Sequence, residues 1–227
     1  MKNILLPVLF GAALFATPAA FAQTAYKMPT KAAKSATAPA TAAAAPATDG
    51  AYKLQPQLST LGWAGRAVTH GHNGTIQFNG GELTVTGGQV TGGTATVDMK
   101  TLKAVDITDA ESQGKFVGHM SSDDFFSVAK YPTATFKIVS IAPIAGAKAD
   151  ANNATIAGDM TIHGTTQRIS FPAKVGVKNG VAAATGKVVI DRTKFGITTS
   201  SKSLSSTLAD KAINDDFSLD FNVVAKK

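Results

Sequence analysis

The four histidines are the residues of this 227-residue chain best suited to hold a metal ion. His70 and His72 form an H-x-H pair, which places both imidazoles on one side if the segment is extended. With His119 or His163 they could supply the nitrogen ligands that zinc and copper prefer. The pair lies in the turn-like THGHNG, however, and no obvious carboxylate ligand stands close in sequence. We expect no metal site, and a His-based metal-binding envelope protein is kept as a minor alternative.

Neither the serines nor the paired carboxylates form a recognisable catalytic group. The run TTSSKSLSS has many hydroxyls but no G-x-S-x-G elbow and no base at a recognisable spacing. Asp123-Asp124 and Asp215-Asp216 are adjacent in sequence, so the carboxylates within each pair diverge and are not a general acid/base couple. The chain has no Walker loop and no dinucleotide fingerprint. We therefore expect no catalytic residue, no enzymatic activity and no cofactor.

Arg192 is predicted to point inward. In VVIDRTKFGI, Val188 and Ile190 share its face, so the guanidinium follows two apolar side chains. A buried arginine needs a partner, because an unpaired charge in a low-dielectric interior is very costly. The partner is either an acid, Asp98 or Asp215, or the polar head of a ligand. Asp98 shares its strand face with two threonines, which weakens that pairing.

The elements that position these residues follow a segment typical of a secretory signal peptide, residues 1–22. Lys2 supplies the positive region, residues 4–15 are apolar, and residues 20–22 offer small side chains for cleavage. The apolar run is too short to span a bilayer permanently, because a spanning helix needs about 20 apolar residues. We expect the mature chain to begin at Gln23 and to reside in the periplasm or outside the cell.

Residues 23–48 are predicted to be a flexible linker, because the stretch from residue 28 is nearly all Ala, Thr and Pro. A glycosylated Thr-rich stalk is the alternative. The chain has no cysteine, so the exported domain has neither disulfides nor thiolate chemistry. Its net charge of +7 is spread without a Lys/Arg run, which argues against a nucleic-acid partner. The folded domain is expected to span residues 49–227.

From Tyr52 onward hydrophobic residues recur at every second position, which predicts strands with one buried face and one solvent-exposed face. Such alternation is typical of antiparallel strands covered on one side. The nine strand candidates lie around residues 60–68, 74–79, 82–86, 93–99, 133–142, 153–162, 166–177, 181–191 and 216–225. Between alternating segments lie turn-forming pairs, namely Gly80-Gly81, Gly87-Gly88, Gly92-Gly93, His163-Gly164 and Asn179-Gly180. Two long excursions, residues 100–132 and 195–214, hold the only helical signals, SSDDFFSVAK and LSSTLADKAI.

Many strands joined by short hairpins indicate either a sandwich or an up-and-down barrel. The predicted buried face mixes large residues with small ones, among them Ala95, Ala134, Gly158 and Ala173. A solid core of this size would usually fill such positions. Small inward residues leave room for another molecule, so we favour a barrel with an internal cavity.

The stretch from Leu58 to Lys227 resembles the YceI-like family of secreted, lipocalin-like proteins. The resemblance rests on six motifs in order: LGWAGRAVTHGHNGTIQF, VDMKTL, GHMSSDDFFSVAKYPTATFKI, GDMTIHGTTQRISFPAKV, IDRTKFGI and LADKAINDDFSLDFNVV. It implies an all-β fold, an extended eight-stranded antiparallel barrel with one or two short helices in its long loops. It also implies a long apolar cavity for a polyisoprenoid or similar long-chain amphiphile. His72 matches the family's His-Asn-Gly turn, which favours a structural hydrogen bond.

Residues 121–130, SSDDFFSVAK, are expected to form a short helix ahead of the next strand. A serine caps it, two acids stand in its first turn, and the Tyr-Pro pair that follows ends it. Successive helical residues point about 100° apart, so at least one of Phe125 and Phe126 would pack over an open barrel end as a plug or lid. The alternative is that both phenylalanines fill the bottom of the barrel as core.

The sequence therefore predicts a non-enzymatic binding protein of the cell envelope. It would hold a long-chain isoprenoid or fatty-acyl-type ligand inside the barrel for transport, storage or sequestration, and its open ends could allow a homodimer. The second hypothesis is a structural or stress-related interaction module whose barrel is filled by its own side chains. The expected ligand contacts are Trp63, Ile76, Phe78, Val97, Phe126, Phe136, Ile138, Met160, Ile162, Phe171, Arg192, Leu219 and Phe221.

Overall fold

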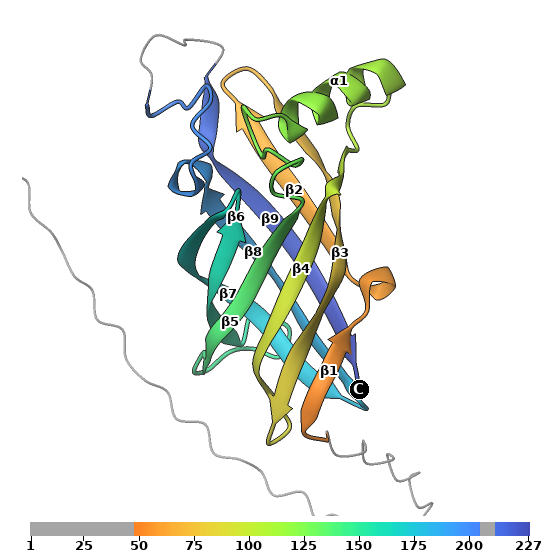
Figure 1. Cartoon of the computed structure of the whole chain (residues 1–227). Coiled ribbons are helices and arrows are strands. Elements are labelled where there is room, and N and C mark those ends of the chain that lie inside the picture. The colour runs from red at the N-terminus through yellow and green to blue at the C-terminus, as the bar shows by residue number, and fades with distance from the viewer. Residues whose placement is uncertain (1–47, 205–211) are drawn as a thin grey trace, which may run out of the picture. The chain divides into compact units, whose positions relative to one another are not determined.

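The computed structural model describes residues 48–204 and 212–227, and these are mostly β-strand (Figure 1). The predicted signal peptide, nearly all of the predicted linker and most of the segment LSSTLADKAI lie outside the described residues. The strands are β1 (Gly50–Leu54), β2 (Thr60–Ala67), β3 (Gly71–Thr86), β4 (Gln89–Ala104), β5 (Thr133–Pro143), β6 (Ala154–Ile162), β7 (Thr165–Lys178), β8 (Val181–Asp191) and β9 (Ile213–Lys226). The helical elements are α1 (Ala110–Ser121) and the 3₁₀ turns η1 (Pro56–Leu58) and η2 (Arg192–Phe195).

The strands pair antiparallel in one sheet that closes on itself. The order runs β2, β9, β8, β7, β6, β5, β4 and β3, and β3 pairs with β2 again. β1 pairs with β3 and β9, the same neighbours as β2, so β1 and β2 share one position in the barrel. η1 separates them, since Pro56 has no N–H to give to a ladder. The predicted eight-stranded antiparallel barrel is thereby confirmed, although β1 was missed.

Three of the five predicted turns are confirmed. Gly87-Gly88, His163-Gly164 and Asn179-Gly180 each have positive φ at both residues. Two-residue hairpins of this kind match the twist of the strands that they join. They connect β3 to β4, β6 to β7 and β7 to β8.

The other two glycine pairs are not turns, contrary to the prediction. Gly80-Gly81 lies within β3, which merges two predicted strands, and Gly92-Gly93 lies within β4. Gly81 has a φ of 140°, and a Cβ there would lie 2.3 Å from the carbonyl oxygen of Thr94. The register of β3 against β4 shifts just before it, between Phe78 and Gly80. Here glycine allows a bulge and a close backbone approach between two long strands rather than a reversal of the chain.

The predicted helix at residues 121–130 is wrong. The helix of this excursion is α1, residues 110–121, and the residues after it form turns. Asp109 caps α1 by accepting a hydrogen bond from a backbone N–H three residues on at 2.7 Å, and such bonds lower the pKa of its carboxyl. Ser122, predicted to begin a helix, instead ends one, with its hydroxyl donating to the carbonyl of His119 at 2.7 Å. None of the helices among the described residues is long and apolar enough to cross a bilayer.

The barrel end that carries β1 and the C-terminus, the lower end in Figure 1, is packed with side chains. Tyr52, Val85 and Ala225 are almost wholly shielded from solvent there. α1 lies at the opposite end (Figure 1). Side chains therefore pack closely around Tyr52 at this end, which also has a pocket of about 280 Å³ near the turn between β3 and β4, and the larger space lies toward α1.

Candidate functional site

An apolar cavity of about 610 Å³ occupies the barrel interior and opens toward the α1 end. This volume falls within the roughly 300–1,000 Å³ typical of small-molecule sites. All thirteen residues that the sequence predicts as ligand contacts line it. They come from β2 (Trp63), β3 (Ile76, Phe78), β4 (Val97), β5 (Phe136, Ile138), β6 (Met160, Ile162), β7 (Phe171), η2 (Arg192), β9 (Leu219, Phe221) and the segment after α1 (Phe126).

The cavity wall also contains residues that the sequence did not predict as ligand contacts. Phe116 and Met120 come from α1, which was not predicted at that position, so no sequence signal placed them at the site. Further missed residues belong to the inward faces of strands whose alternation could have revealed them, namely Leu61, Leu83, Met99, Ala184, Val188 and Val223.

α1 is fastened at the mouth by an aromatic stack and by side-chain hydrogen bonds. The ring of Phe116 stacks on Trp63 with centroids 5.9 Å apart and planes 11° apart. The indole N–H of Trp63 donates to the carbonyl of Lys103 at 3.2 Å, near the end of β4. Gln113 donates to the carbonyl of Ala104 at 2.8 Å, which ties α1 to the same strand end. α1 thus forms one side of the entrance.

The H-x-H pair lies at this entrance and is engaged by a carboxylate. The rings of His70 and His72 have centroids 5.4 Å apart, and both residues line the cavity. Nδ1 of His72 lies 2.8 Å from a carboxylate oxygen of Asp106, whose other oxygen accepts the N–H of Asn73 at 3.2 Å. Partial burial raises the pKa of Asp106, but these hydrogen bonds outweigh it and the net pKa is lowered. Asp106 was overlooked because it is remote in sequence.

This arrangement fits the expected structural role of His72. Within residues 48–204 and 212–227, no group of three or more His, Asp and Glu side chains is arranged to hold a metal ion. His119 stands against the ring of Phe125, with centroids 4.9 Å apart. His163 lies elsewhere, with Nε2 3.2 Å from the hydroxyl of Ser127 and its other ring nitrogen 3.3 Å from the carbonyl oxygen of Phe195.

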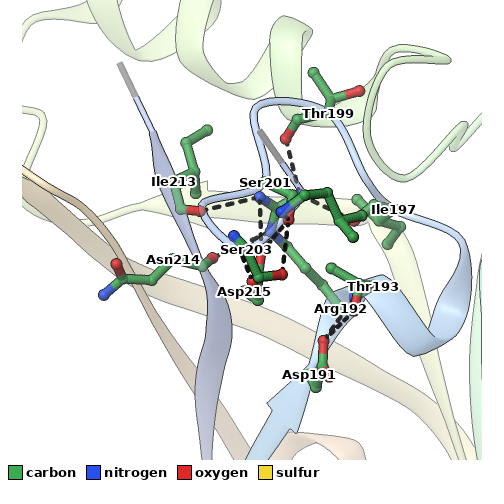
Figure 2. A network of polar contacts seen from close by, with 11 residues as sticks. Asp191, Arg192, Thr193, Ile197, Thr199, Ser201, Ser203, Ile213, Asn214 and Asp215 are labelled. Atoms are coloured by element: carbon green, nitrogen blue, oxygen red, sulfur yellow. Dashed lines mark hydrogen bonds and ion pairs between the residues drawn. The ribbon is translucent and has the colours of Figure 1, made fainter. Parts of the chain in front are cut away.

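Arg192 is 4% exposed and binds four backbone carbonyls, as Figure 2 shows. Nη1 donates to Ile197 and Thr199, both at 2.9 Å. Nε and Nη2 donate to Asn214 at 3.2 Å and Ile213 at 3.3 Å. These bonds join the loop after η2 to the first residues of β9, so the guanidinium holds together one side of the cavity mouth.

Of the two predicted acidic partners, Asp215 lies beside Arg192, with a carboxylate oxygen 3.9 Å from Nη2. Asp98 instead accepts a hydrogen bond from the backbone N–H of Lys100 at 3.0 Å. Burial lowers the pKa of Arg192, and the charge of Asp215 opposes that shift. Burial raises the pKa of Asp215, but hydrogen bonds from Ser201 and Ser203, together with the guanidinium, lower it overall.

The two phenylalanines of SSDDFF both line the cavity, although no helix presents them. Phe125 is buried, and its ring lies 5.7 Å from the guanidinium carbon of Arg192. Phe126 is half-buried. Arg192 thus places Phe125 at the cavity mouth, and the backbone N–H of Phe126 donates to the carbonyl of Met120 at the end of α1 at 3.1 Å, so both residues lie at the α1 end.

Comparison with known proteins gives one family match over nearly the whole barrel. The model of the YceI-like domain matches residues 52–225. Among curated proteins, Protein YceI of Escherichia coli is 39% identical and a UPF0312 protein of Pseudomonas aeruginosa 37% identical, each over 57 residues. Each alignment covers 25% of this chain and 27% of the relative, so the chain aligns with about a quarter of the length of these curated relatives.

Two solved structures have a similar fold. BcnA of Burkholderia cenocepacia has a TM-score of 0.59 at 19% identity, covering 76% of this chain and 99% of that one. A polyisoprenoid binding domain from Saccharophagus degradans, implicated in plant cell wall breakdown, has a TM-score of 0.53 at 16% identity. That alignment covers 77% of this chain and 97% of the domain. At these identities the likeness concerns the fold, and it agrees with the predicted lipocalin-like barrel.

Proposed function

This chain belongs to the YceI-like family, and from that premise we propose that it binds a long-chain amphiphile of the isoprenoid or fatty-acyl type. The hydrocarbon chain would lie in the barrel cavity, and the polar head would lie at the α1 end. The observation that carries the proposal is the cavity itself, about 610 Å³ in volume and walled by apolar side chains from every strand position of the barrel.

The energetics favour a chain over a compact polar ligand. Each buried methylene contributes about 0.8 kcal/mol, so ten methylenes contribute roughly 8 kcal/mol before the cost of association is subtracted. That gain needs no polar anchor, and for hydrocarbon chains that fit in the cavity it changes by only about 0.8 kcal/mol with each methylene. The polar side chains that line the cavity gather at its entrance, among them Arg66, His70, His72, His119 and Asn214. This separation of an apolar interior from a polar rim suits an amphiphile.

The competing hypothesis of a structural or stress-related module requires an interior filled by the barrel's own side chains. The surroundings of Tyr52 at the lower end are closely packed, but the barrel as a whole does not meet that requirement. A cavity of this volume in the rest of the barrel favours the binding role.

The cellular setting is part of the same proposal. We propose that residues 1–22 direct export to the periplasm or beyond, since a basic residue, an apolar run and small residues follow one another there. Transport, storage and sequestration of the ligand, and a homodimer, are compatible with a carrier of this kind. Mass determination of the exported protein would reveal cleavage near Ala22. An exported protein that still contained residues 1–22 would contradict the proposal.

Organic extraction of the purified protein, followed by mass spectrometry, tests the binding role. We expect a co-purified amphiphile at near-stoichiometric yield. The ring of Phe136 lines the cavity, whereas its neighbour Lys137 is exposed. Phe136→Asp should therefore abolish lipid recovery and Lys137→Ala should retain it, with circular dichroism verifying that both variants fold. Equal recovery from the two variants, or a clean extract from the wild type, would contradict the assignment.

A further inference from the structure

Three aromatic rings form a row along the cavity wall. Phe136, Phe171 and Phe221 lie on β5, β7 and β9, and successive ring centroids are 5.5 Å apart. The two strands between them carry glycines, Gly158 on β6 and Gly186 on β8. Aromatic residues and glycines thus alternate from strand to strand around this side of the barrel.

Each glycine lies beneath one of these rings. A Cβ on Gly158 would come within 2.4 Å of Cζ of Phe136, and a Cβ on Gly186 within 2.9 Å of Cζ of Phe221. Gly186 and Phe221 are also directly opposite one another in the β8–β9 ladder. Neither glycine has a positive φ, so the backbone conformation itself does not require glycine. What requires glycine is the space that the ring occupies against the wall.

The position of Phe221 shows what this space is for. In β9 it precedes Val223 and Ala225, and Ala225 belongs to the packed lower end. It pairs with Leu61, close to η1, on the other side. The ring of Phe221 therefore lies in the deep part of the cavity, where any displacement toward the axis shortens the space available to a chain.

We propose that Gly158 and Gly186 are specificity-determining residues, because they let Phe136 and Phe221 lie flat against the wall and so set the depth of the cavity. The length or bulk of the bound hydrocarbon chain is then limited by these two glycine–phenylalanine pairs. The inference rests on the proposed function, since it concerns which hydrocarbon chains the same cavity accepts.

Gly186 gives the cleaner test of the two. At Gly158 a Cβ would also come within 2.6 Å of the backbone carbonyl of Lys137, so alanine there strains the strand pairing as well. At Gly186 the two nearest atoms are the far end of the Phe221 ring, and the carbonyl of Pro172 follows at 3.2 Å. Gly186→Ala should therefore act mainly by turning that ring into the cavity.

The probes are dodecanol, hexadecanol and docosanol, titrated while the fluorescence of Trp63 is recorded. Trp63 is the only tryptophan of the chain and lines the cavity. In a hydrophobic pocket the loss of room for one methylene changes affinity about 10–200-fold. We expect Gly186→Ala to lose roughly tenfold or more for docosanol and to bind dodecanol almost as the wild type does. Gly176→Ala is the matched control, because a Cβ at this exposed position on β7 meets nothing within 4 Å.

Phe221→Leu provides the reciprocal test. Alone it should shift the preference toward the longest alcohol. In the double variant Gly186→Ala/Phe221→Leu it should restore the wild-type length profile, that is, the relative affinities for the three alcohols. If Gly186→Ala fails to fold, Phe221→Leu decides the matter, and an unchanged length profile overturns the inference. A wild-type profile in folded Gly186→Ala overturns it while leaving the proposed function intact. A wild type that binds none of the three alcohols would overturn both.

Discussion

Replacing Arg192 by methionine tests whether this buried cation serves the fold or the ligand. Methionine keeps much of the side-chain volume but removes every hydrogen bond to the four carbonyls. Only the bond to Ile197 is fully buried, and the other three are partly accessible, so water can replace the guanidinium in part. A hydrogen bond to a charged group is worth about 1.5–3 kcal/mol, and removal of one member of a buried ion pair typically costs about 3–5 kcal/mol.

We therefore expect Arg192→Met to lower the free energy of unfolding by roughly 3–5 kcal/mol. In a domain of this size each kcal/mol shifts the midpoint of thermal unfolding by about 2–4 °C, so the Tm should fall by roughly 6–20 °C. The assay is thermal unfolding of the delipidated protein followed by circular dichroism. Arg192→Lys should be intermediate, because lysine lacks the planar fork that reaches several carbonyls.

Arg168→Met is the matched control, since that guanidinium binds Asp159 on the exposed surface and its loss should leave the Tm close to the wild-type value. The reasoning is refuted if Arg192→Met in delipidated protein melts within about 2 °C of the wild type. Such a result, combined with a loss of affinity for a long-chain alcohol, would assign Arg192 to the polar head of the ligand instead.

Three further outcomes test other parts of the structure. Gly81→Ala should lower the free energy of unfolding, measured by urea titration, by about 1–3 kcal/mol through backbone strain. Gly80→Ala is the control and should lower it much less, because a Cβ there meets nothing within 4 Å. Equal effects would contradict the close approach of β3 and β4. Because the pKa of Asp106 is lowered from its ordinary value of 3.8, its ionised carboxylate stabilises the fold above that pH, and this contribution is lost as pH falls through the folded pKa. Asp106→Asn should therefore make the free energy of unfolding less dependent on pH in the acid range. An unchanged dependence would count against the bond to His72. Zinc should not raise the Tm, and a rise of several degrees would revive the metal hypothesis.

The sequence predicted the barrel well because alternation reports which face of a strand is buried, and the twelve residues chosen on that basis line the cavity. Phe126, chosen from a predicted helix that does not form, lines it as well. It located the helix poorly for a local reason. SSDDFFSVAK contains serines and acids of the kind that begin helices, but the real helix is capped by Asp109, twelve residues before Ser121, with Glu111 in its first turn. Glycine pairs were equally ambiguous. Gly87-Gly88 reverses the chain, whereas Gly80-Gly81 permits a bulge, and the difference depends on the facing strand.

The origin of the cavity differs from the one that the sequence suggested. Small inward residues were expected to leave room, and Ala95 and Ala134 do line the cavity. Ala173, however, is completely buried in packed surroundings, and Gly158 is covered by the ring of Phe136. At that position glycine creates space indirectly, because it lets a large ring lie along the wall instead of crossing the interior. The free volume of such a barrel therefore depends on how small and large residues pair between adjacent strands, and a count of small residues on one face does not measure it.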